Sequence, residues 1–177
     1  MITHIPKIDY EVLCDTNHVN NKSELKRLSV AVSNYGFLII KKYPINIKNI
    51  NNVFSIYKDF FKLKYEEKNK INMSNTLSNR GWGGPKAEQV NTNYNPDYKE
   101  IFDCGPEIKI KHQFEELTYY SKNIWPKQIP LFEKIVMSFY KSCSEIAISI
   151  LQQIEISLQY SNNYFADKFN FPMALLR

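Results

Sequence analysis

An apolar stripe of about eight helical turns between Pro130 and Tyr160 is the strongest pattern in the sequence. Its large apolar residues recur with the i, i+3, i+4, i+7 spacing of one helix face. They are Phe132, Ile135, Val136, Phe139, Cys143, Ile146, Ala147, Ile150, Leu151, Ile154 and Leu158. A helix of that length with one apolar face must pack along other elements, and a sheet is the most suitable surface. The stripe therefore predicts one long helix that organises the rest of the chain.

Two short elements and a buried strand are predicted near the start of the chain. Ile5–Asp9 alternates apolar and polar residues, which is typical of an edge strand. Ser23–Asn34 has helical apolar spacing, with Ser23 as its predicted cap and Gly36 as its predicted stop. Phe37–Ile40 is then predicted to be a buried strand, because it offers no polar face.

The middle of the chain combines a second helix with a long polar segment. Ile47–Leu63 has an apolar helix face formed by Ile50, Val53, Phe54, Tyr57, Phe60 and Phe61. Residues 72–98 are rich in Gly, Pro and Asn, which discourages regular structure. A loop of this length is often functional, so we expect a lid or a binding segment there. Lys99–Gly105 is predicted to be a short strand, and Met173–Arg177 the opening of another that needs a partner strand.

The charge and the apolar pattern exclude several classes of protein. The chain has 23 basic and 18 acidic residues, but arginine occurs only at positions 27, 80 and 177. Base readout favours the forked guanidinium, and the lysines are interleaved with acids, so the basic balance indicates solvated surface rather than nucleic-acid binding. No apolar run approaches the roughly 18–20 residues that span a membrane, and no secretory signal opens the sequence. We expect a cytoplasmic protein without a membrane partner.

Seven short motifs follow one another in order along the chain. They are Ile5–Asp9, Tyr35–Ile40, Phe60–Lys68, Arg80–Trp82, Asp97–Phe102, Trp125–Pro126 and Leu176–Arg177. Together they resemble the N-terminal half of the non-haem iron(II), 2-oxoglutarate-dependent dioxygenase family that includes isopenicillin N synthase. Two departures affect loops: Lys42–Ile45 replaces the family's N-H-G-I, and Lys64 stands where the family has Pro.

The resemblance implies an α+β fold. It would consist of an N-terminal helical and strand region and the long helix of a double-stranded β-helix (jelly-roll) oxygenase, whose core barrel is incomplete here. The implied division has two parts. Residues 1–112 form an N-terminal-type domain with lid loop 72–98, and residues 113–177 form the long helix and the first strand of the core.

The residues that perform the family's chemistry have no counterpart in this sequence. The family binds iron through His-x-Asp and a distant His, and binds 2-oxoglutarate through Arg-x-Ser. The histidines here are His4, His18 and His112, and none is followed two residues later by Asp. The resemblance therefore implies no catalytic residue, no metal ligand and no bound cofactor in this chain, although the family uses Fe(II) and usually 2-oxoglutarate. The three cysteines, Cys14, Cys104 and Cys143, form no C-x-x-C pair and are expected to be reduced thiols.

Arg80 is the one residue to which the resemblance assigns a candidate role. It matches a position where synthase-like proteins direct an Arg toward the substrate carboxylate, which a guanidinium binds with two hydrogen bonds. Trp82 and Tyr94 would line the same lid. The alternative for Arg80 is a surface side chain packed beside Trp82, and for both aromatic residues it is ordinary packing.

Two hypotheses of function come from these observations. In the first, the chain is a truncated or split dioxygenase that carries the supporting region without the catalytic core, and its partner is a separate C-terminal half. In the second, the chain is a non-catalytic interaction module that associates with itself or with a partner through exposed edges. Nucleic-acid binding through the lysines is a third and weaker alternative.

Overall fold

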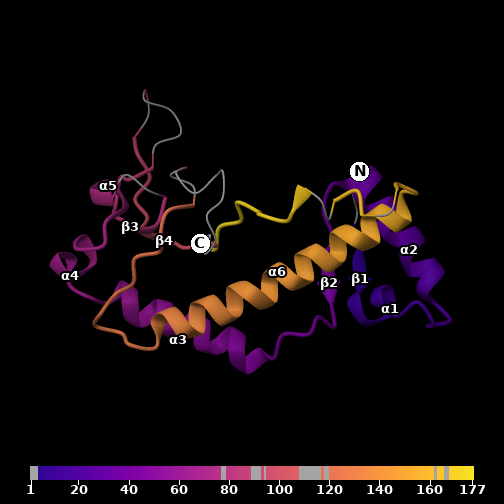
Figure 1. Cartoon of the computed structure of the whole chain (residues 1–177), viewed down its shortest axis with the longest axis horizontal. Helices are drawn as coiled ribbons and strands as arrows, with labels where there is room; N and C mark the ends of the chain where they lie inside the picture. The colour runs from indigo at the N-terminus through magenta and orange to yellow at the C-terminus, as the bar shows by residue number, and fades with distance from the viewer. Residues whose placement is uncertain are drawn as a thin grey trace. The chain divides into compact units, whose positions relative to one another are not determined.

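The computed structural model describes residues 4–76, 79–88, 93, 95–107, 117, 120–161, 163–165 and 168–177. Its elements (Figure 1) are β1 (Lys7–Asp9), α1 (Tyr10–Cys14), α2 (Asn21–Val30), the π-helix η1 (Ala31–Tyr35), β2 (Ile39–Lys41), α3 (Ile47–Phe61), α4 (Tyr65–Asn69), α5 (Met73–Thr76), β3 (Gly81–Gly83), β4 (Ile101–Asp103) and α6 (Phe132–Ser157). Contacts divide the chain into unit 1, Met1–Ile45 with Lys141–Pro172, and unit 2, Asn46–Tyr140 with Met173–Arg177. The predicted long helix is confirmed as α6, which contributes residues to both units.

Unit 1 is built on two parallel strands. Strand β1 pairs with β2, so that Ile8 lies opposite Ile40. Ile8, Leu13 and Leu28 form the fully buried core, and Ile154 of α6 packs against them. Tertiary contacts thus explain why so short a sheet persists.

The local predictions for unit 1 have mixed outcomes. Gly36 ends the helical segment as predicted, in the left-handed conformation with φ of 75°. The predicted cap is wrong, because Ser23 lies inside α2 and its hydroxyl donates to the carbonyl of Asn20 at 3.0 Å. The predicted buried strand is also wrong: Ile39 is 43% exposed, since β2 pairs only with β1 among the described strands.

Unit 2 is held together by aromatic rings. Phe60 of α3, Phe102 of β4 and Phe132 of α6 are buried, and their ring centroids lie 5.0 to 5.4 Å apart. The contacts of Phe102 with the other two rings are edge-to-face, and such contacts add to the free energy of burial. The predicted apolar face of α3 is wrong at Phe54, which is 73% exposed, whereas Ile56 is buried in the core.

Strand β3 corrects the prediction that the whole segment 72–98 is irregular. Gly81–Gly83 is buried and pairs antiparallel with β4, so that Trp82 lies opposite Phe102. A Cβ at Gly81 would lie 2.3 Å from the carbonyl oxygen of Ile71, which accepts a hydrogen bond from the Trp82 amide. The glycine therefore allows a close backbone approach rather than a turn.

The predicted strand at Met173–Arg177 has the partner that its backbone requires. Leu176 forms an antiparallel bridge with Cys104, and the two residues exchange amide-to-carbonyl hydrogen bonds of 2.8 and 3.1 Å. Residues 173–177 are called the terminal strand below. The predicted domain division at residues 112 and 113 lies outside the described residues and stays a prediction. None of the helices in the described part of the chain is long and apolar enough to cross a membrane.

Candidate functional site

Arg80, the candidate substrate-binding residue, lies in the interior of unit 2 rather than at the surface. Its side chain has no exposed area. The Nε atom donates to the carbonyl of Ser121 at 3.4 Å, and Nη2 donates to the carbonyl of Pro106 at 3.3 Å. Burial lowers the pKa of this guanidinium from its ordinary value, although an arginine stays charged in proteins.

Gly105 makes room for the Arg80 guanidinium. A Cβ at Gly105 would lie 2.4 Å from the Nη1 atom of Arg80 and 2.8 Å from the carbonyl oxygen of Ala174. The guanidinium therefore lies where the end of β4 meets the terminal strand. A substrate carboxylate would have to replace backbone carbonyls as the acceptor, so the role in carboxylate binding stays a prediction.

The predicted lid residue Trp82 belongs to a buried polar network. Its Nε1 atom donates to Glu100 Oε2 at 2.9 Å, and Lys68 Nζ lies 2.5 Å from the same oxygen. Lys68 also donates to the carbonyl of Phe61 at 3.1 Å. A buried ammonium needs such partners, and here they attach α4 to the strand pair. Tyr94, the other predicted lid residue, lies outside the described residues.

A second charged network fastens the terminal strand. Arg177 forms two parallel hydrogen bonds of 2.9 Å with the buried carboxylate of Asp103. Its Nη1 atom also lies 2.7 Å from Glu88, which pairs with Lys99 at 2.7 Å. The hydrogen bonds to Asp103 raise the pKa of Arg177, and the one from Lys99 lowers the pKa of Glu88.

Sequence reasoning missed this network, although its members stand in or beside quoted motifs. Arg177 closes the Leu-Arg motif, and Asp103 directly follows Asp97–Phe102. The bidentate pair joins two segments far apart in sequence. Only the shared presence of both motifs could have indicated the contact.

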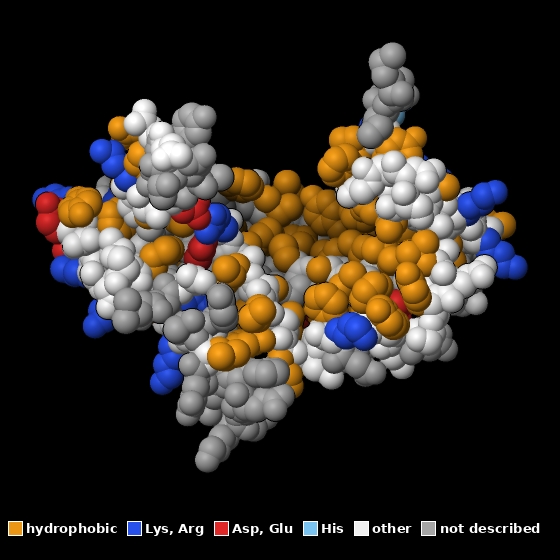
Figure 2. Space-filling view, turned by 90° about the horizontal axis from the view of Figure 1, so that it is seen from above, with side chains coloured by type: hydrophobic (Ala, Val, Ile, Leu, Met, Phe, Trp, Pro, Cys, Tyr) orange, Lys and Arg blue, Asp and Glu red, His pale blue; other side chains and the backbone are white. Residues whose placement is uncertain are grey.

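An apolar groove of about 490 Å³ opens beside the terminal strand in unit 2. One wall is α3, and the other is formed by β4, α6 and the terminal strand. The lining residues are Ile50, Val53, Phe54, Tyr57, Lys58, Phe61, Glu100, Phe102, Phe139, Leu176 and Arg177. Hydrophobic side chains remain at the surface over both units (Figure 2).

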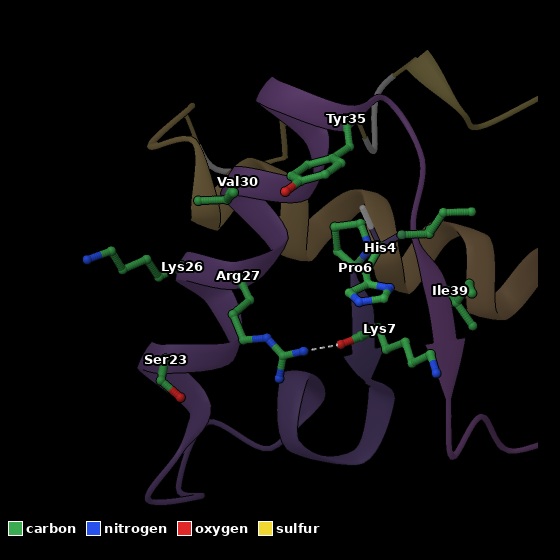
Figure 3. Close-up of a pocket in the computed structure, with 10 residues that line it drawn as sticks. His4, Pro6, Lys7, Ser23, Lys26, Arg27, Val30, Tyr35 and Ile39 are labelled. Atoms are coloured by element: carbon green, nitrogen blue, oxygen red, sulfur yellow. Dashed lines mark hydrogen bonds between the residues drawn. The ribbon is translucent and has the colours of Figure 1, made fainter. Parts of the chain in front are cut away.

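Unit 1 has a larger open groove, of about 1060 Å³, between α2 and the strand pair. It is lined by apolar residues together with His4, Lys7, Lys26 and Arg27. Figure 3 shows that Arg27 is directed to the Lys7 carbonyl, whereas the Lys26 side chain points away. The cations therefore do not converge on one point, as an anion site would require.

The described residues do not fit an iron centre. No group of three His, Cys, Asp or Glu side chains among them is arranged to hold a metal ion. His4 lines the groove of unit 1, while the Nδ1 atom of His18 accepts a hydrogen bond from the Asn20 amide at 3.1 Å. His112 lies outside the described residues. All three cysteines have free thiols.

Burial modifies the one thiol that lies in the core. Cys104 is fully buried beside the terminal strand, which raises its pKa to about 12. Burial also raises the pKa of the neighbouring Tyr57 hydroxyl. Both groups are therefore neutral at physiological pH and serve packing rather than nucleophilic chemistry.

Curated proteins with similar sequences are about twice as long as this chain, and several are named as 2-oxoglutarate-Fe(II) oxidoreductases or hydroxylases. Homoarginine-6-hydroxylase 2-ODD-C23.1 of Arabidopsis thaliana is 31% identical over 145 residues, which are 81% of this chain and 43% of that protein. A 2-oxoglutarate-Fe(II) type oxidoreductase of Aspergillus fumigatus is 23% identical over 177 residues, with 97% and 52% of the two chains covered. The chain spans about half the length of the curated relatives it matches.

Solved structures show the same fold and the same partial coverage. A full-length Neurospora crassa protein solved in complex with alpha-KG superposes with a TM-score of 0.73 at 24% identity, covering 91% of this chain and 49% of that protein. The jelly-roll oxygenase fold is therefore shared, and the described strands of this chain represent an incomplete part of its sheet. Residues 5–128 also match the family model described as non-haem dioxygenase in morphine synthesis N-terminal. The chain belongs to the isopenicillin N synthase-like family of 2-oxoglutarate/Fe(II) dioxygenases and corresponds to the N-terminal region of its members.

Proposed function

We propose that this chain is the supporting part of a 2-oxoglutarate/Fe(II) oxygenase and that its 177 residues alone neither bind iron nor turn over 2-oxoglutarate. The proposal rests on the share of each relative that this chain matches, which is about half. The family match runs from residue 5 to residue 128, and the relatives with known enzyme names are about twice as long. The sequence has no His-x-Asp motif.

The chain's own residues would act by fixing geometry. The aromatic cluster of Phe60, Phe102 and Phe132 holds α3, β4 and α6 against one another. The bidentate pair of Arg177 and Asp103 fixes the terminal strand on β4. An active site needs this kind of rigid support, because small displacements of reacting groups are costly.

The first test uses the chain by itself. Anaerobic calorimetric titration with Fe(II), and then with 2-oxoglutarate, should show no binding with a Kd below about 100 μM. Succinate formation should equal that of buffer. Iron binding in the micromolar range, with succinate release, would contradict the proposal.

A second test supplies the part that the relatives have in addition. We would fuse the chain to the part of the Neurospora crassa protein that it does not cover, and assay succinate with thymine present, because that protein has been solved with alpha-KG and thymine. Turnover by the folded fusion supports the proposal. A fusion that shows native near-ultraviolet circular dichroism but no turnover contradicts it.

The non-catalytic interaction module is the second candidate function. It is favoured by two exposed apolar residues of unit 2, Phe54, which lines the groove and is 73% exposed, and Leu175 of the terminal strand, which is 46% exposed. Turnover in the fusion separates the two functions, since an interaction module has no reason to support catalysis.

A further inference from the structure

The segment between β3 and β4 is closed at its base by two backbone hydrogen bonds. The Lys86 amide donates to the Asp97 carbonyl at 2.8 Å, and the Asp97 amide donates to the Glu88 carbonyl at 3.0 Å. Residues 86–88 and 97 are called the loop base below. Lys86 has a φ of 70°, in the left-handed region that a lysine rarely adopts. Such a conformation persists only where other contacts hold it, so the loop base needs support from side chains.

Two carboxylates supply this support. The Nζ atom of Lys99 lies 2.7 Å from Glu88 Oε2 and 2.9 Å from Asp97 Oδ2, so one ammonium joins the two ends of the segment. The other oxygen of Glu88, Oε1, lies 2.7 Å from Arg177 Nη1. Glu88 therefore uses one oxygen for the loop base and the other for the terminal strand. Its carboxylate is charged at neutral pH, because the hydrogen bond from Lys99 lowers its pKa.

Arg177 is itself anchored on β4. Its Nε and Nη2 atoms bind the buried carboxylate of Asp103, and bidentate pairs of this kind are strong and directional. The preceding residue, Leu176, exchanges two backbone hydrogen bonds with Cys104. The position of the guanidinium thus depends on the pairing of the terminal strand with β4, and Glu88 contacts the Nη1 atom that Asp103 does not use.

These contacts differ in how strongly salt weakens them. The side chains of Glu88 and Lys99 are 32% and 49% exposed, whereas that of Asp103 is 3% exposed. Salt screens exposed charges much more than buried ones. The contact of Glu88 with Arg177 therefore opens before the pair of Arg177 with Asp103.

We propose that Glu88 is a salt-sensitive clasp that couples the closure of the loop base to the pairing of the terminal strand with β4. Each element is held more firmly when the other is in place, since a coupling free energy between two sites acts equally in both directions. All the groups of the clasp belong to unit 2. The coupling is independent of the proposed function and can be tested on the chain by itself.

The test measures the protection of backbone amides against hydrogen exchange, by NMR on the full chain. Four amides report on the two elements: Lys86 and Asp97 in the loop base, and Cys104 and Leu176 in the bridge to β4. Glu88→Gln keeps the shape of the side chain and removes its charge. It should lower the protection of all four amides at least about 5-fold.

Two controls separate this coupling from general destabilisation. The Trp82 amide donates to the Ile71 carbonyl at 2.8 Å in the core of unit 2, and its protection should change less than about 2-fold in Glu88→Gln. Glu66→Gln removes a carboxylate at an exposed position on α4 and should leave the four amides within about 2-fold of the parent chain.

The reverse direction of the coupling is tested from the terminal strand. Arg177→Met removes the guanidinium and leaves the pairs of Lys99 with Glu88 and Asp97 in place. Protection of the Lys86 amide should nevertheless fall at least about 3-fold. In the double variant of Glu88→Gln and Arg177→Met it should fall by less than the product of the two single effects, because both substitutions remove the same contact.

Salt supplies a measurement that needs no variant. Raising NaCl from about 0.05 M to about 1 M should lower the protection of the four amides in parallel, at least about 3-fold relative to Trp82. A fall in Glu88→Gln that is confined to Lys86 and Asp97 would overturn the proposal, and so would an equal fall at Trp82. Four amides that do not respond to salt in the parent chain would contradict it even if both variants failed to fold.

Discussion

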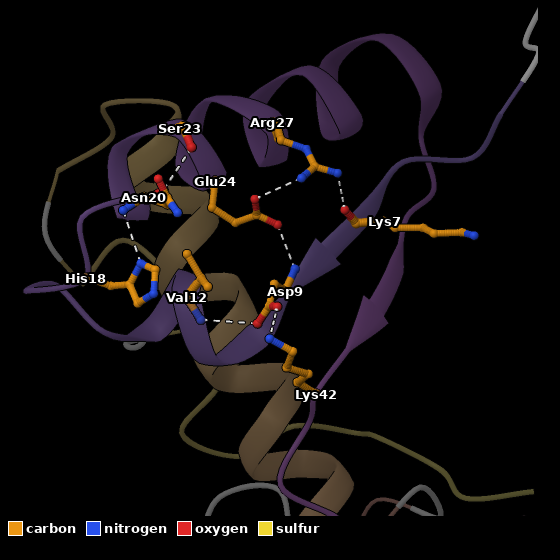
Figure 4. Close-up of polar contacts among 9 residues, drawn as sticks. All are labelled: Lys7, Asp9, Val12, His18, Asn20, Ser23, Glu24, Arg27 and Lys42. Carbon is orange, nitrogen blue, oxygen red and sulfur yellow. Dashed lines mark hydrogen bonds and ion pairs between the residues drawn. The ribbon is translucent and has the colours of Figure 1, made fainter.

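The two units treat the open edge of a strand in opposite ways. In unit 1 the outer edge of β1 is covered by side chains of α2 (Figure 4): the Asp9 amide donates to Glu24 at 2.6 Å, and Arg27 donates to the Lys7 carbonyl. In unit 2 the outer edge of the terminal strand carries the unpaired backbone groups of Leu175. Both edges present the same polar groups, which require partners when they are removed from water.

The difference lies in where the partners come from. Glu24 and Arg27 stand one turn apart on one helix, pair with each other at 3.1 Å and complete the edge within unit 1. No side chain described in unit 2 does this for Leu175. An edge completed by its own unit has no need of another strand, whereas an open edge next to an apolar groove offers both affinity and specificity to one.

The largest effect is expected where the terminal strand receives its support. Phe102→Ala removes a buried ring that contacts Phe60 and Phe132, and should lower the free energy of unfolding by about 3–5 kcal/mol. Urea titration followed by tryptophan fluorescence measures it, because Trp82 and Trp125 both belong to unit 2. Phe54→Ala, at an exposed position, should cost less than about 0.5 kcal/mol. Equal losses in the two variants would show that the aromatic cluster does not support the strand.

The next effect reports how firmly the terminal strand covers Cys104. A buried thiol with a pKa of about 12 has almost no thiolate at pH 8, so iodoacetamide should modify Cys104 at least about 100-fold more slowly than the half-buried Cys14. Mass spectrometry of the alkylated peptides gives both rates. Arg177→Ala should accelerate only Cys104, because it releases the bidentate pair with Asp103. Comparable rates in the parent chain would mean that the strand edge opens freely.

The sequence predicted those elements whose formation depends on neighbouring residues. The long helix followed from apolar periodicity, and the stop at Gly36 from the left-handed conformation that glycine adopts easily. The need of Met173–Arg177 for a partner strand followed from its backbone groups. The motif order identified the family, because spacing over the whole chain carries more information than any one motif.

Burial of charge was not predictable, because its cause is distant in sequence. Buried Arg80 donates hydrogen bonds to the carbonyls of Pro106 and Ser121, and buried Lys68 donates one to the carboxylate of Glu100. A single sequence shows such residues as polar, and polar residues are usually exposed. Strand β3 was missed for the same reason, since glycine-rich composition indicates a turn until its partner β4 is known.

Removing Glu24 should expose the edge of β1. Glu24→Ala removes the acceptor of the Asp9 amide and one of the two acceptors of Arg27, and should cost about 2 kcal/mol. Glu24→Gln retains an acceptor and should cost about half as much. Thermal unfolding followed by circular dichroism compares them with Glu66→Ala, at an exposed position on α4. No loss in Glu24→Ala would show that water replaces the carboxylate and that this edge is not held by α2.

The smallest effect concerns the ion pair at the end of the same strand. Lys42 lies 2.7 Å from Asp9, whose carboxylate also caps α1 by accepting from the Val12 amide, and the hydrogen bond from Lys42 lowers the pKa of Asp9. A lowered pKa means that the stabilisation is present above about pH 4 and is lost as the pH falls through the pKa of folded Asp9. The protection of the Val12 amide against hydrogen exchange, relative to its intrinsic rate at each pH, should fall on acidification toward about pH 3 more steeply in the parent chain than in Lys42→Met, and Lys41→Met should behave like the parent. If the pH dependence of exchange at Val12 is the same in all three chains, Lys42 does not stabilise this edge, and the charged side chains that contact it in the described structure are then Glu24 and Arg27.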